Sequence, residues 1–246
     1  MQLARRESGS GVLAKPILPG EESASTPAGI EVVTIDYTDD RLNRLTAADY
    51  SDGRFFHYRY DAVGNRLSET TPAGSTCYYY DVANRLVEVY DNGQNPTCQP
   101  AGSVSGVMYT WDNNGNLLSD GEYTYSYDHA NRLKSVTNGI DFSASYNYNG
   151  LGDRVSQTVN AVTTNFTLDM NSGLTQVLQE GSNSYLYGNQ RLAQYDANGP
   201  VYFLGDALGS VRQLVDASGA VTLSKGYEPY GEELNSQGTG ASSYSY

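Results

Sequence analysis

The sequence has few of the residues on which catalytic and metal sites usually depend. Only two histidines, two cysteines and three methionines occur in 246 residues. No Gly-Xaa-Ser-Xaa-Gly motif or phosphate-binding glycine loop is found. His57 falls in an expected strand and His129 in an expected turn, with no nucleophile pattern nearby, so both are interpreted as structural. We therefore expect no catalytic residue, no metal site and no cofactor, and hence no enzyme activity.

Positive charge and long apolar runs are also scarce. Lys and Arg number 15 against 28 Asp and Glu, a net charge of −13, which repels phosphate backbones and argues against a nucleic-acid partner. No apolar run approaches the roughly 18 residues needed to cross a bilayer, so no membrane span is expected. Residues 1–11 lack the apolar segment of a secretory signal, so this chain carries no recognisable export signal.

What the sequence does contain favours strands and turns. The sequence contains 22 tyrosines and 26 glycines but only five phenylalanines and one tryptophan. This is a mixture of strand-forming and turn-forming residues. Residues 1–29 are rich in Gly, Ser, Pro and Glu and show no period, which is typical of a flexible leader. An all-β fold is expected for the rest.

From residue 30 the sequence repeats about every 20 residues, with one insertion around Cys98. Each copy has an aromatic residue, any residue, a second aromatic, an acid, two or three turn residues and then Asn-Arg-Leu. The fullest copy spans Tyr58 to Leu67. The residues that define the motif are Tyr60, Asp61, Arg66, Leu67, Tyr80, Asp81, Arg85, Leu86, Trp111, Asp112, Tyr127, Asp128, Arg132 and Leu133.

This period predicts tandem β-hairpins that form a long twisted antiparallel sheet, because two short strands and two tight turns use about 20 residues. The paired aromatics are spaced i, i+2 and should share one face, where rings of neighbouring repeats would stack. Asn138-Gly139 predicts a two-residue type I′ turn.

The acids of the motif allow two interpretations. Asp61, Asp81, Asp112 and Asp128 could form a row of carboxylates for metal or acid-base chemistry, but we favour turn caps that pair with the repeat arginines. Those arginines, Arg44, Arg66, Arg85 and Arg132, are expected to bridge neighbouring hairpins. The segment at 112–116 spaces oxygen ligands like a calcium loop but lacks its sixth-position Gly and twelfth-position Glu, so calcium is not favoured.

The repeated landmarks resemble the Rhs and YD-repeat family, and the final segment is similar to the opening of the Rhs-associated core. The residues of that segment are Asp206, Gly209, Ser210, Arg212, Tyr227, Pro229 and Gly231. After the leader expected at residues 1–29, the resemblance implies repeats at 30–200 and the start of the core at 201–246. It also implies a β-ribbon that spirals into a hollow shell, which encloses an effector in toxins of this family and serves adhesion or carbohydrate binding in other members. The family's self-cleavage segment and effector are absent from the sequence, so no catalytic residue is carried over.

The size of the sheet limits what this chain can enclose. Eight hairpins with strands about 4.8 Å apart give a ribbon of roughly 77 Å, and a ring of that circumference is only about 25 Å across. A passenger of about 100 residues needs more than about 30 Å. We therefore expect an open or partial piece of a β-shell within a larger protein or assembly.

Two local features remain open at this stage. A Cys77–Cys98 disulfide is geometrically reasonable, since one cysteine precedes a strand and the other lies in the insertion after its hairpin. Trp111 and the tyrosine face could contact glycans, but a packed sheet face is the favoured explanation.

The expected function is that of a non-catalytic scaffold or encapsulating segment of a secreted or cell-surface protein of bacterial type. The alternative is an adhesion module that binds carbohydrate or protein through its aromatic face or edge strands. Expected partners are further repeats or an effector domain of the same longer protein, and other copies of the chain through sheet edges.

Overall fold

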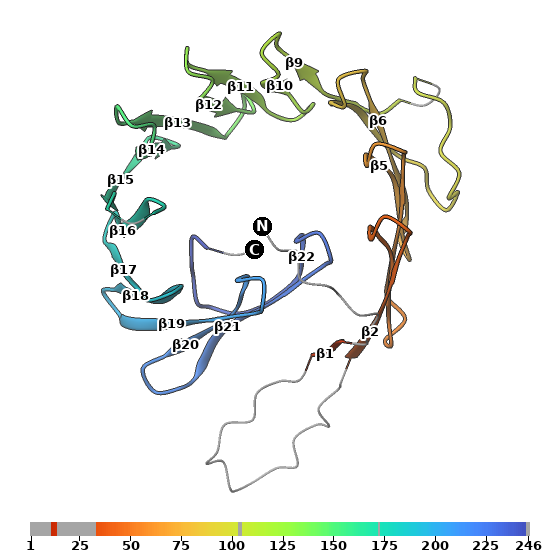
Figure 1. Ribbon diagram of the computed structural model, residues 1–246. Coiled ribbons are helices and arrows are strands. Elements are labelled where there is room, and N and C mark those ends of the chain that lie inside the picture. The colour runs from red at the N-terminus through yellow and green to blue at the C-terminus, as the bar shows by residue number, and fades with distance from the viewer. Residues whose placement is uncertain (1–10, 14–32, 103–104, 172, 245–246) are drawn as a thin grey trace, which may run out of the picture. The chain divides into compact units, whose positions relative to one another are not determined.

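The computed structural model describes residues 11–13, 33–102, 105–171 and 173–244, and their regular structure is β-strand throughout (Figure 1). The expected all-β class of tandem hairpins is confirmed. Of the leader expected at residues 1–29, the structure describes Gly11–Leu13, which form a strand paired with Val33–Ile35. The remainder of that segment lies outside the described residues.

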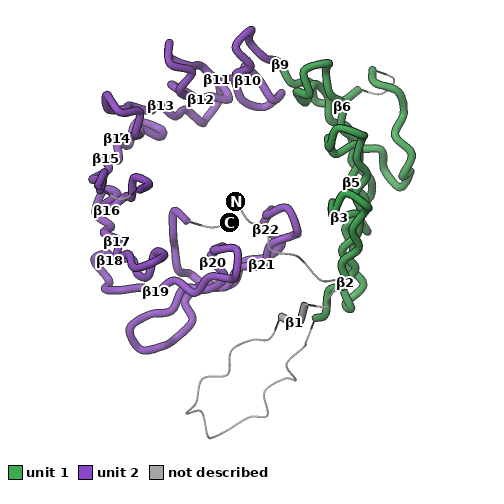
Figure 2. The backbone as a smooth tube through the Cα atoms, viewed as in Figure 1, with its two compact units in different colours: residues 1–110 green, residues 111–246 purple. Residues whose placement is uncertain are grey.

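The chain divides into two compact units, residues 1–110 and 111–246 (Figure 2). The strands of the first unit form one eight-stranded sheet in chain order. They are β1 (Gly11–Leu13), β2 (Val33–Asp39), β3 (Leu45–Tyr50), β4 (Phe55–Tyr60), β5 (Arg66–Thr71), β6 (Gly74–Tyr80), β7 (Leu86–Asp91) and β8 (Val107–Met108).

The second sheet has fourteen strands, again in chain order. They are β9 (Thr110–Trp111), β10 (Leu117–Ser119), β11 (Thr124–Tyr127), β12 (Leu133–Thr137), β13 (Ser143–Tyr148), β14 (Arg154–Val159), β15 (Val162–Asp169), β16 (Gln176–Glu180), β17 (Asn183–Tyr187), β18 (Arg191–Asp196), β19 (Gly199–Gly205), β20 (Val211–Asp216), β21 (Val221–Tyr227) and β22 (Glu233–Gly238). The strand order of each sheet is linear, so neither sheet closes into a barrel.

Strand alternation places the aromatic residues of each repeat on one face of its sheet, which we call the tyrosine face. In β4, Phe56 and Tyr58 are buried while His57 and Arg59, which point the other way, are exposed. In the second unit this face carries a small core of Val211, Leu214 and Leu223, against which Tyr244 packs.

The prediction of a type I′ turn at Asn138-Gly139 was wrong. Asn138 does not have a positive φ, and its Oδ1 instead accepts the backbone N–H groups of Ile140, Asp141 and Phe142 across a longer loop. The backbone that a type I′ turn requires occurs at Asn160 (φ 45°) and Ala161 (φ 67°), which connect the paired residues Val159 and Val162. Side-chain capping by Asn138 outweighed the dipeptide preference.

Candidate functional site: contacts between neighbouring hairpins

The turn after β6 shows how an acid of the motif is used. Asp81 Oδ1 accepts the backbone N–H groups of Ala83 (2.8 Å) and Arg85 (3.0 Å), and Oδ2 accepts Arg85 Nε (2.7 Å). Asn84, three residues after the acid, has a φ of 60°. The result is a type I turn followed by a left-handed residue, and the pairing of β6 with β7 shifts by one residue at Tyr79/Tyr80.

The same arrangement recurs at the turns of Asp40 and Asp128, whose carboxylates hold Arg44 and Arg132. At Asp61 and Asp112 an asparagine amide replaces the guanidinium, from Asn65 and Asn116 respectively, each at 2.8 Å. Hydrogen bonds from the backbone N–H and then the guanidinium of Arg85 hold the pKa of Asp81 below its ordinary value, and Arg132 does the same for Asp128. These acids are ionised turn caps with their oxygens engaged.

The arginines of the motif are of two kinds, which differ in the number of residues that separate them from the turn acid. Where Asn itself is the left-handed residue, as at Asn84, the following Arg is the fourth residue after the acid and binds its carboxylate. Where Gly64 takes that position, Asn65 binds the carboxylate and Arg66 moves on to the fifth position. Because one residue of offset reverses which face a side chain points to, Arg66 lies opposite Tyr60, whereas Leu86 lies opposite Tyr80.

The fifth residue after the acid receives a hydrogen bond from the next hairpin. The tyrosine immediately before each turn donates its hydroxyl proton to that residue's backbone carbonyl. The pairs are Tyr60 to Leu45 (2.7 Å), Tyr80 to Arg66 (3.0 Å), Tyr148 to Leu133 (2.7 Å) and Tyr227 to Val211 (3.0 Å). This tyrosine therefore ties every such hairpin to the one before it.

Arginine side chains lie across the tyrosine rings. Arg44 lies 4.8 Å from the Tyr60 ring centroid, and its Nη1 donates to the Asp61 carbonyl of the next turn at 2.6 Å. Arg132 repeats both contacts with Tyr148 and Asn149. These contacts join one hairpin to the next, as cation–π pairs and charge-assisted hydrogen bonds.

The expected direct stacking of rings is replaced where an arginine stands between them. Arg66 lies 5.8 Å from the Tyr58 ring and 4.6 Å from the Tyr78 ring, and it forms an ion pair with Glu69 at 3.1 Å. Burial raises the pKa of the Tyr78 hydroxyl above its ordinary value, although Arg66 opposes the shift. A guanidinium is favoured between two electron-rich ring faces, which repel one another when stacked directly.

The tyrosine face is largely covered by its own side chains. Tyr58 is 3% exposed and Tyr185 is 7% exposed. Trp111 is half-buried in β9. Rings available for stacking on a sugar would need to be open to solvent, so this geometry does not favour the glycan contact.

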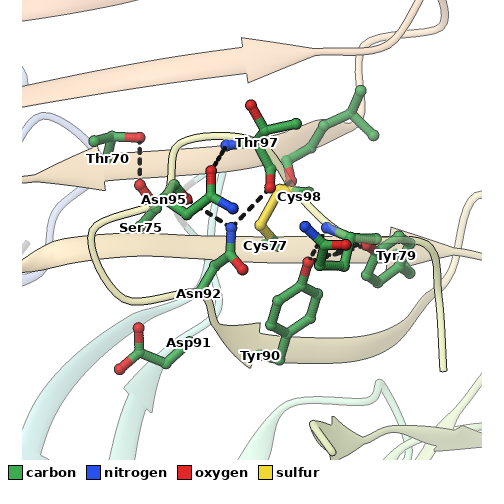
Figure 3. The surroundings of a disulfide bond; sticks show 12 residues. Thr70, Ser75, Cys77, Tyr79, Tyr90, Asp91, Asn92, Asn95, Thr97 and Cys98 are labelled. Carbon is green, nitrogen blue, oxygen red and sulfur yellow. Dashed lines mark hydrogen bonds between the residues drawn. A yellow bond between two sulfur atoms is a disulfide. The ribbon is translucent and has the colours of Figure 1, made fainter. Parts of the chain in front are cut away.

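The opposite face of β5–β7 is covered by the insertion. Cys77 in β6 and Cys98 form a disulfide with Cα atoms 5.8 Å apart, and Figure 3 shows it joining the sheet to the loop. Asn92 Nδ2 donates to the carbonyls of Asn95 (2.6 Å) and Thr97 (2.9 Å). Beneath the loop, Cys77 and Ser68 are 0% and 1% exposed.

The segment that resembles the Rhs core uses the same turn geometry. Asp206 caps the backbone N–H groups of Leu208 and Ser210, Gly209 has a φ of 91°, and Arg212 Nε binds Asp206 Oδ2 at 3.0 Å. Pro229 and Gly231 belong to the corresponding turn after Tyr227, where Gly231 has a φ of 95°. The motif residues are therefore parts of two further hairpins.

The structure does not bring the remaining candidate residues of the sequence together in one site. His57 binds Asp49 at 2.8 Å across two strands, and His129 is an exposed turn residue. Asp112 Oδ1 accepts the backbone N–H groups of Asn114 and Asn116, as the acids of the other turns do. Within the described residues, no group of three or more His, Cys, Asp or Glu side chains could hold a metal ion. Nor does any helix in that part of the chain have the length and hydropathy needed to cross a membrane.

Comparison with known proteins identifies relatives of this repeat. The family model of the teneurin YD-shell matches residues 24–242. The tRNA3(Ser)-specific nuclease WapA of Bacillus spizizenii is 32% identical over 211 residues, and the tRNA nuclease WapA of Bacillus subtilis strain 168 is 30% identical over 211 residues. Each alignment covers 80% of this chain and 8% of the relative, so the chain spans about a twelfth of their length.

Solved structures of TcdB2–TccC3 toxin complexes are also similar. The TcdB2–TccC3–Cdc42 structure has a TM-score of 0.38 and 18% identity, covering 84% of this chain and 15% of that one. The form without the hypervariable C-terminal region has a TM-score of 0.33 and 17% identity, covering 85% and 15%.

Proposed function

The chain belongs to the teneurin YD-shell family, and from that premise we propose that it is a non-catalytic wall segment of a longer shell protein that encloses an effector. The observation that carries this proposal is the repeated set of contacts from each hairpin to the next. Carboxylates, guanidiniums and tyrosine hydroxyls, the groups that could do chemistry, are engaged in turns and between strands. A wall needs such contacts along its whole length, whereas an active site needs a few groups held ready for substrate.

The relatives suggest what a wall of this kind serves. Both WapA proteins are named as tRNA nucleases, and the segment shared with this chain is 8% of each. We assign to this segment the enclosing role and place any effector activity in another part of a longer protein. A domain that binds tRNA carries positive charge, which the net charge of −13 of this chain complements.

The proposed partners and location follow from the same contacts. Among the strands that the structure describes, β22 pairs only with β21, so its other edge can accept a further hairpin of the same protein or another copy of the chain. A disulfide such as Cys77–Cys98 persists in oxidising compartments, which supports a secreted or cell-surface location.

A cleavage assay tests the absence of chemistry in this segment. The purified chain is incubated with total tRNA and Mg²⁺, and the products are separated on a denaturing gel. The proposal expects intact tRNA. Cleavage that copurifies with the chain and is abolished by one substitution within it, while the circular dichroism spectrum is unchanged, would overturn the proposal.

A further inference from the structure

The segment after the last strand folds back onto the tyrosine face of its own sheet. Strand β22 ends at Gly238, whose φ is 106°. A Cβ at this position would overlap the Thr222 carbonyl, so this path of the chain requires glycine. Thr239 and Gly240 then donate their N–H groups to the same carbonyl, at 3.0 and 2.9 Å. We call residues 239–244 the tail.

The tail lies across the strands instead of pairing with one of them. No strand in the described part of the chain pairs with residues 239–244. The tail contacts β21 at Thr222, β18 through Gln194 and β17 at Tyr185. Its residues alternate between exposed and half-buried, and Tyr244 is one of the half-buried ones. The tail is therefore an extended peptide that turns every second residue towards the sheet.

The sheet holds the tail mainly at its two ends. Between these ends, a hollow of 660 Å³ is lined both by residues 239–243 and by residues of β18 to β21. In the middle of the tail, Gln194 Nε2 donates to the Ala241 carbonyl at 3.4 Å, which is a long hydrogen bond. A segment with few contacts opens at a lower free energy than the strands beneath it.

The far end of the tail is an aromatic anchor. Tyr244 packs edge-on against Tyr185, with ring centroids 5.1 Å apart, and against Phe203 at 6.4 Å. Arg191 lies over the Tyr244 ring, and the ring also packs against the small core of this unit. We call the site formed by Tyr185, Arg191, Phe203 and this core the socket. A single aromatic side chain in such a site commonly dominates the binding of a peptide.

The sheet builds the socket without help from the tail. Arg191 lies 5.7 Å from the Tyr185 ring and 5.8 Å from the Phe203 ring, which belong to neighbouring hairpins. Arg154 is placed in the same way between two rings of its own neighbouring hairpins. Because the repeat produces this arrangement by itself, Tyr244 is an addition to the socket and not a part of the repeat.

We propose that the tail is a releasable latch and that the socket is a docking site for it. The latch leaves and re-enters the socket while the sheet stays folded, and its release uncovers the tyrosine face from β17 to β21. The open socket accepts the same segment as a separate peptide, an extended uncharged chain with one aromatic side chain. The contacts of the tail are not among the contacts between hairpins that support the wall proposal, so either proposal can fail alone.

Binding of the free tail peptide to the full-length chain tests the latch. The probe is dye-labelled Gly-Thr-Gly-Ala-Ser-Ser-Tyr amide, the sequence of residues 238–244, and fluorescence anisotropy measures its binding. The Tyr244→Ala chain has an open socket, so it should bind the probe at least about tenfold more tightly than the wild-type chain. In the wild-type chain the attached tail competes at a roughly millimolar effective concentration.

Two controls separate the socket from nonspecific binding. A peptide with Ala in place of its Tyr should not bind the Tyr244→Ala chain. The Tyr202→Ala chain loses an exposed tyrosine but keeps its latch, so it should bind the probe as weakly as the wild-type chain does. No saturable binding to the Tyr244→Ala chain, or equal affinity of that chain and the wild-type chain, overturns the proposal.

A second variant ties the binding to the socket. Arg191→Met in the Tyr244→Ala chain removes the guanidinium that lies over the bound ring, and it should weaken probe binding about tenfold. Unchanged affinity of this double variant contradicts the assignment of the socket.

Hydrogen exchange of the wild-type chain decides the question if a variant does not fold. The amides of Thr239 and Gly240 are informative, because the Thr222 carbonyl accepts both of them. A latch predicts that they exchange at least about tenfold faster than the paired amides of β20 and β21. Exchange of these two amides at the same rate as the strands would show that the tail opens only with the sheet, and it overturns the proposal.

Discussion

The Tyr80 hydroxyl donates to the backbone carbonyl of Arg66 at 3.0 Å, across the boundary between one hairpin and the next. The acceptor is the fifth residue after the turn acid Asp61, and the donor immediately precedes the next turn acid, Asp81. The same relationship joins Tyr60 to Leu45. The tyrosine and the acid of the motif thus work together, since the acid shapes the turn and the tyrosine fixes the distance to the preceding turn.

Removing one of these hydroxyls should destabilise the sheet. Tyr148→Phe leaves the ring and removes the 2.7 Å bond to Leu133, and we expect a loss of about 1 kcal/mol in the free energy of unfolding. Urea unfolding followed by tyrosine fluorescence measures it. Tyr202→Phe is the control, because Tyr202 is 42% exposed and its hydroxyl makes no described contact. Equal effects of the two substitutions would contradict the role of the hydroxyl.

Removing a turn acid should be more damaging than removing an acid from a strand surface. Asp128→Ala removes the acceptor of two backbone N–H groups and of Arg132, and we expect the thermal midpoint to fall by about 2–4 °C. Asp36→Ala is the control, because Asp36 lies exposed opposite Asp49, a pairing of like charges. Scanning calorimetry that finds the larger loss at Asp36 would argue against capping.

The left-handed position should decide which residues a turn accepts. Asn84 has a φ of 60°, so Asn84→Gly should be tolerated. Asn84→Val should lower the free energy of unfolding by about 1–3 kcal/mol, because a branched Cβ clashes with the backbone in the left-handed conformation. The same two substitutions at the exposed neighbour Ala83, where φ is not positive, should show the opposite order, with Val tolerated at least as well as Gly. Urea midpoints of the four variants check this. An Asn84→Val variant as stable as the Asn84→Gly variant would be inconsistent with the turn geometry.

The disulfide should stabilise the insertion and the strands beneath it. The two cysteines are 21 residues apart in the sequence. Reducing their disulfide should lower the free energy of unfolding by roughly 3 kcal/mol, because the unfolded chain gains conformational entropy. Elastase digestion with and without reductant should show new cleavage within residues 92–106, a segment that contains small residues such as Ala101 for this protease to cleave after. The Cys77→Ala/Cys98→Ala variant provides the control, since reductant must not change its digestion pattern. An unchanged midpoint and pattern in the wild-type chain after reduction would count against this role.

Acid should weaken the turns. The pKa values of Asp81 and Asp128 are lower in the folded chain than in the unfolded one, first because of the backbone N–H groups of Arg85 and Arg132. Their contribution is therefore fully present above the ordinary carboxyl pKa of about 3.9 and is lost as pH falls through the lowered values. We expect the urea midpoint to be flat from about pH 7 to 5, chosen to lie above that range, and to fall below about pH 4. Asp81→Asn/Asp128→Asn should show a shallower fall, and an identical profile would contradict the assignment.

Much of this architecture follows from the sequence, because the aromatic spacing and the recurring acid determine where strands and turns lie. The offset between the turns of Asn84 and Gly64 was missed, since both copies end in Asn-Arg-Leu. A count of residues from each acid would have revealed it. The insertion of Arg66 between two rings was missed for the same reason, because its face depends on that count. The path of residues 239–243 could not be predicted, since it depends on hydrogen bonds to Thr222 and to the Gln194 side chain rather than on the repeat.

The central claim is that this chain is a wall and that any chemistry belongs to another part of a longer protein. Electron cryo-microscopy of the complete polypeptide that contains this segment tests it most directly. The account predicts that strands β2 to β22 continue, hairpin by hairpin, into further repeats that enclose a separate folded domain. A map in which these strands stand apart from any enclosing sheet, or in which substrate is bound on the tyrosine face, would contradict it.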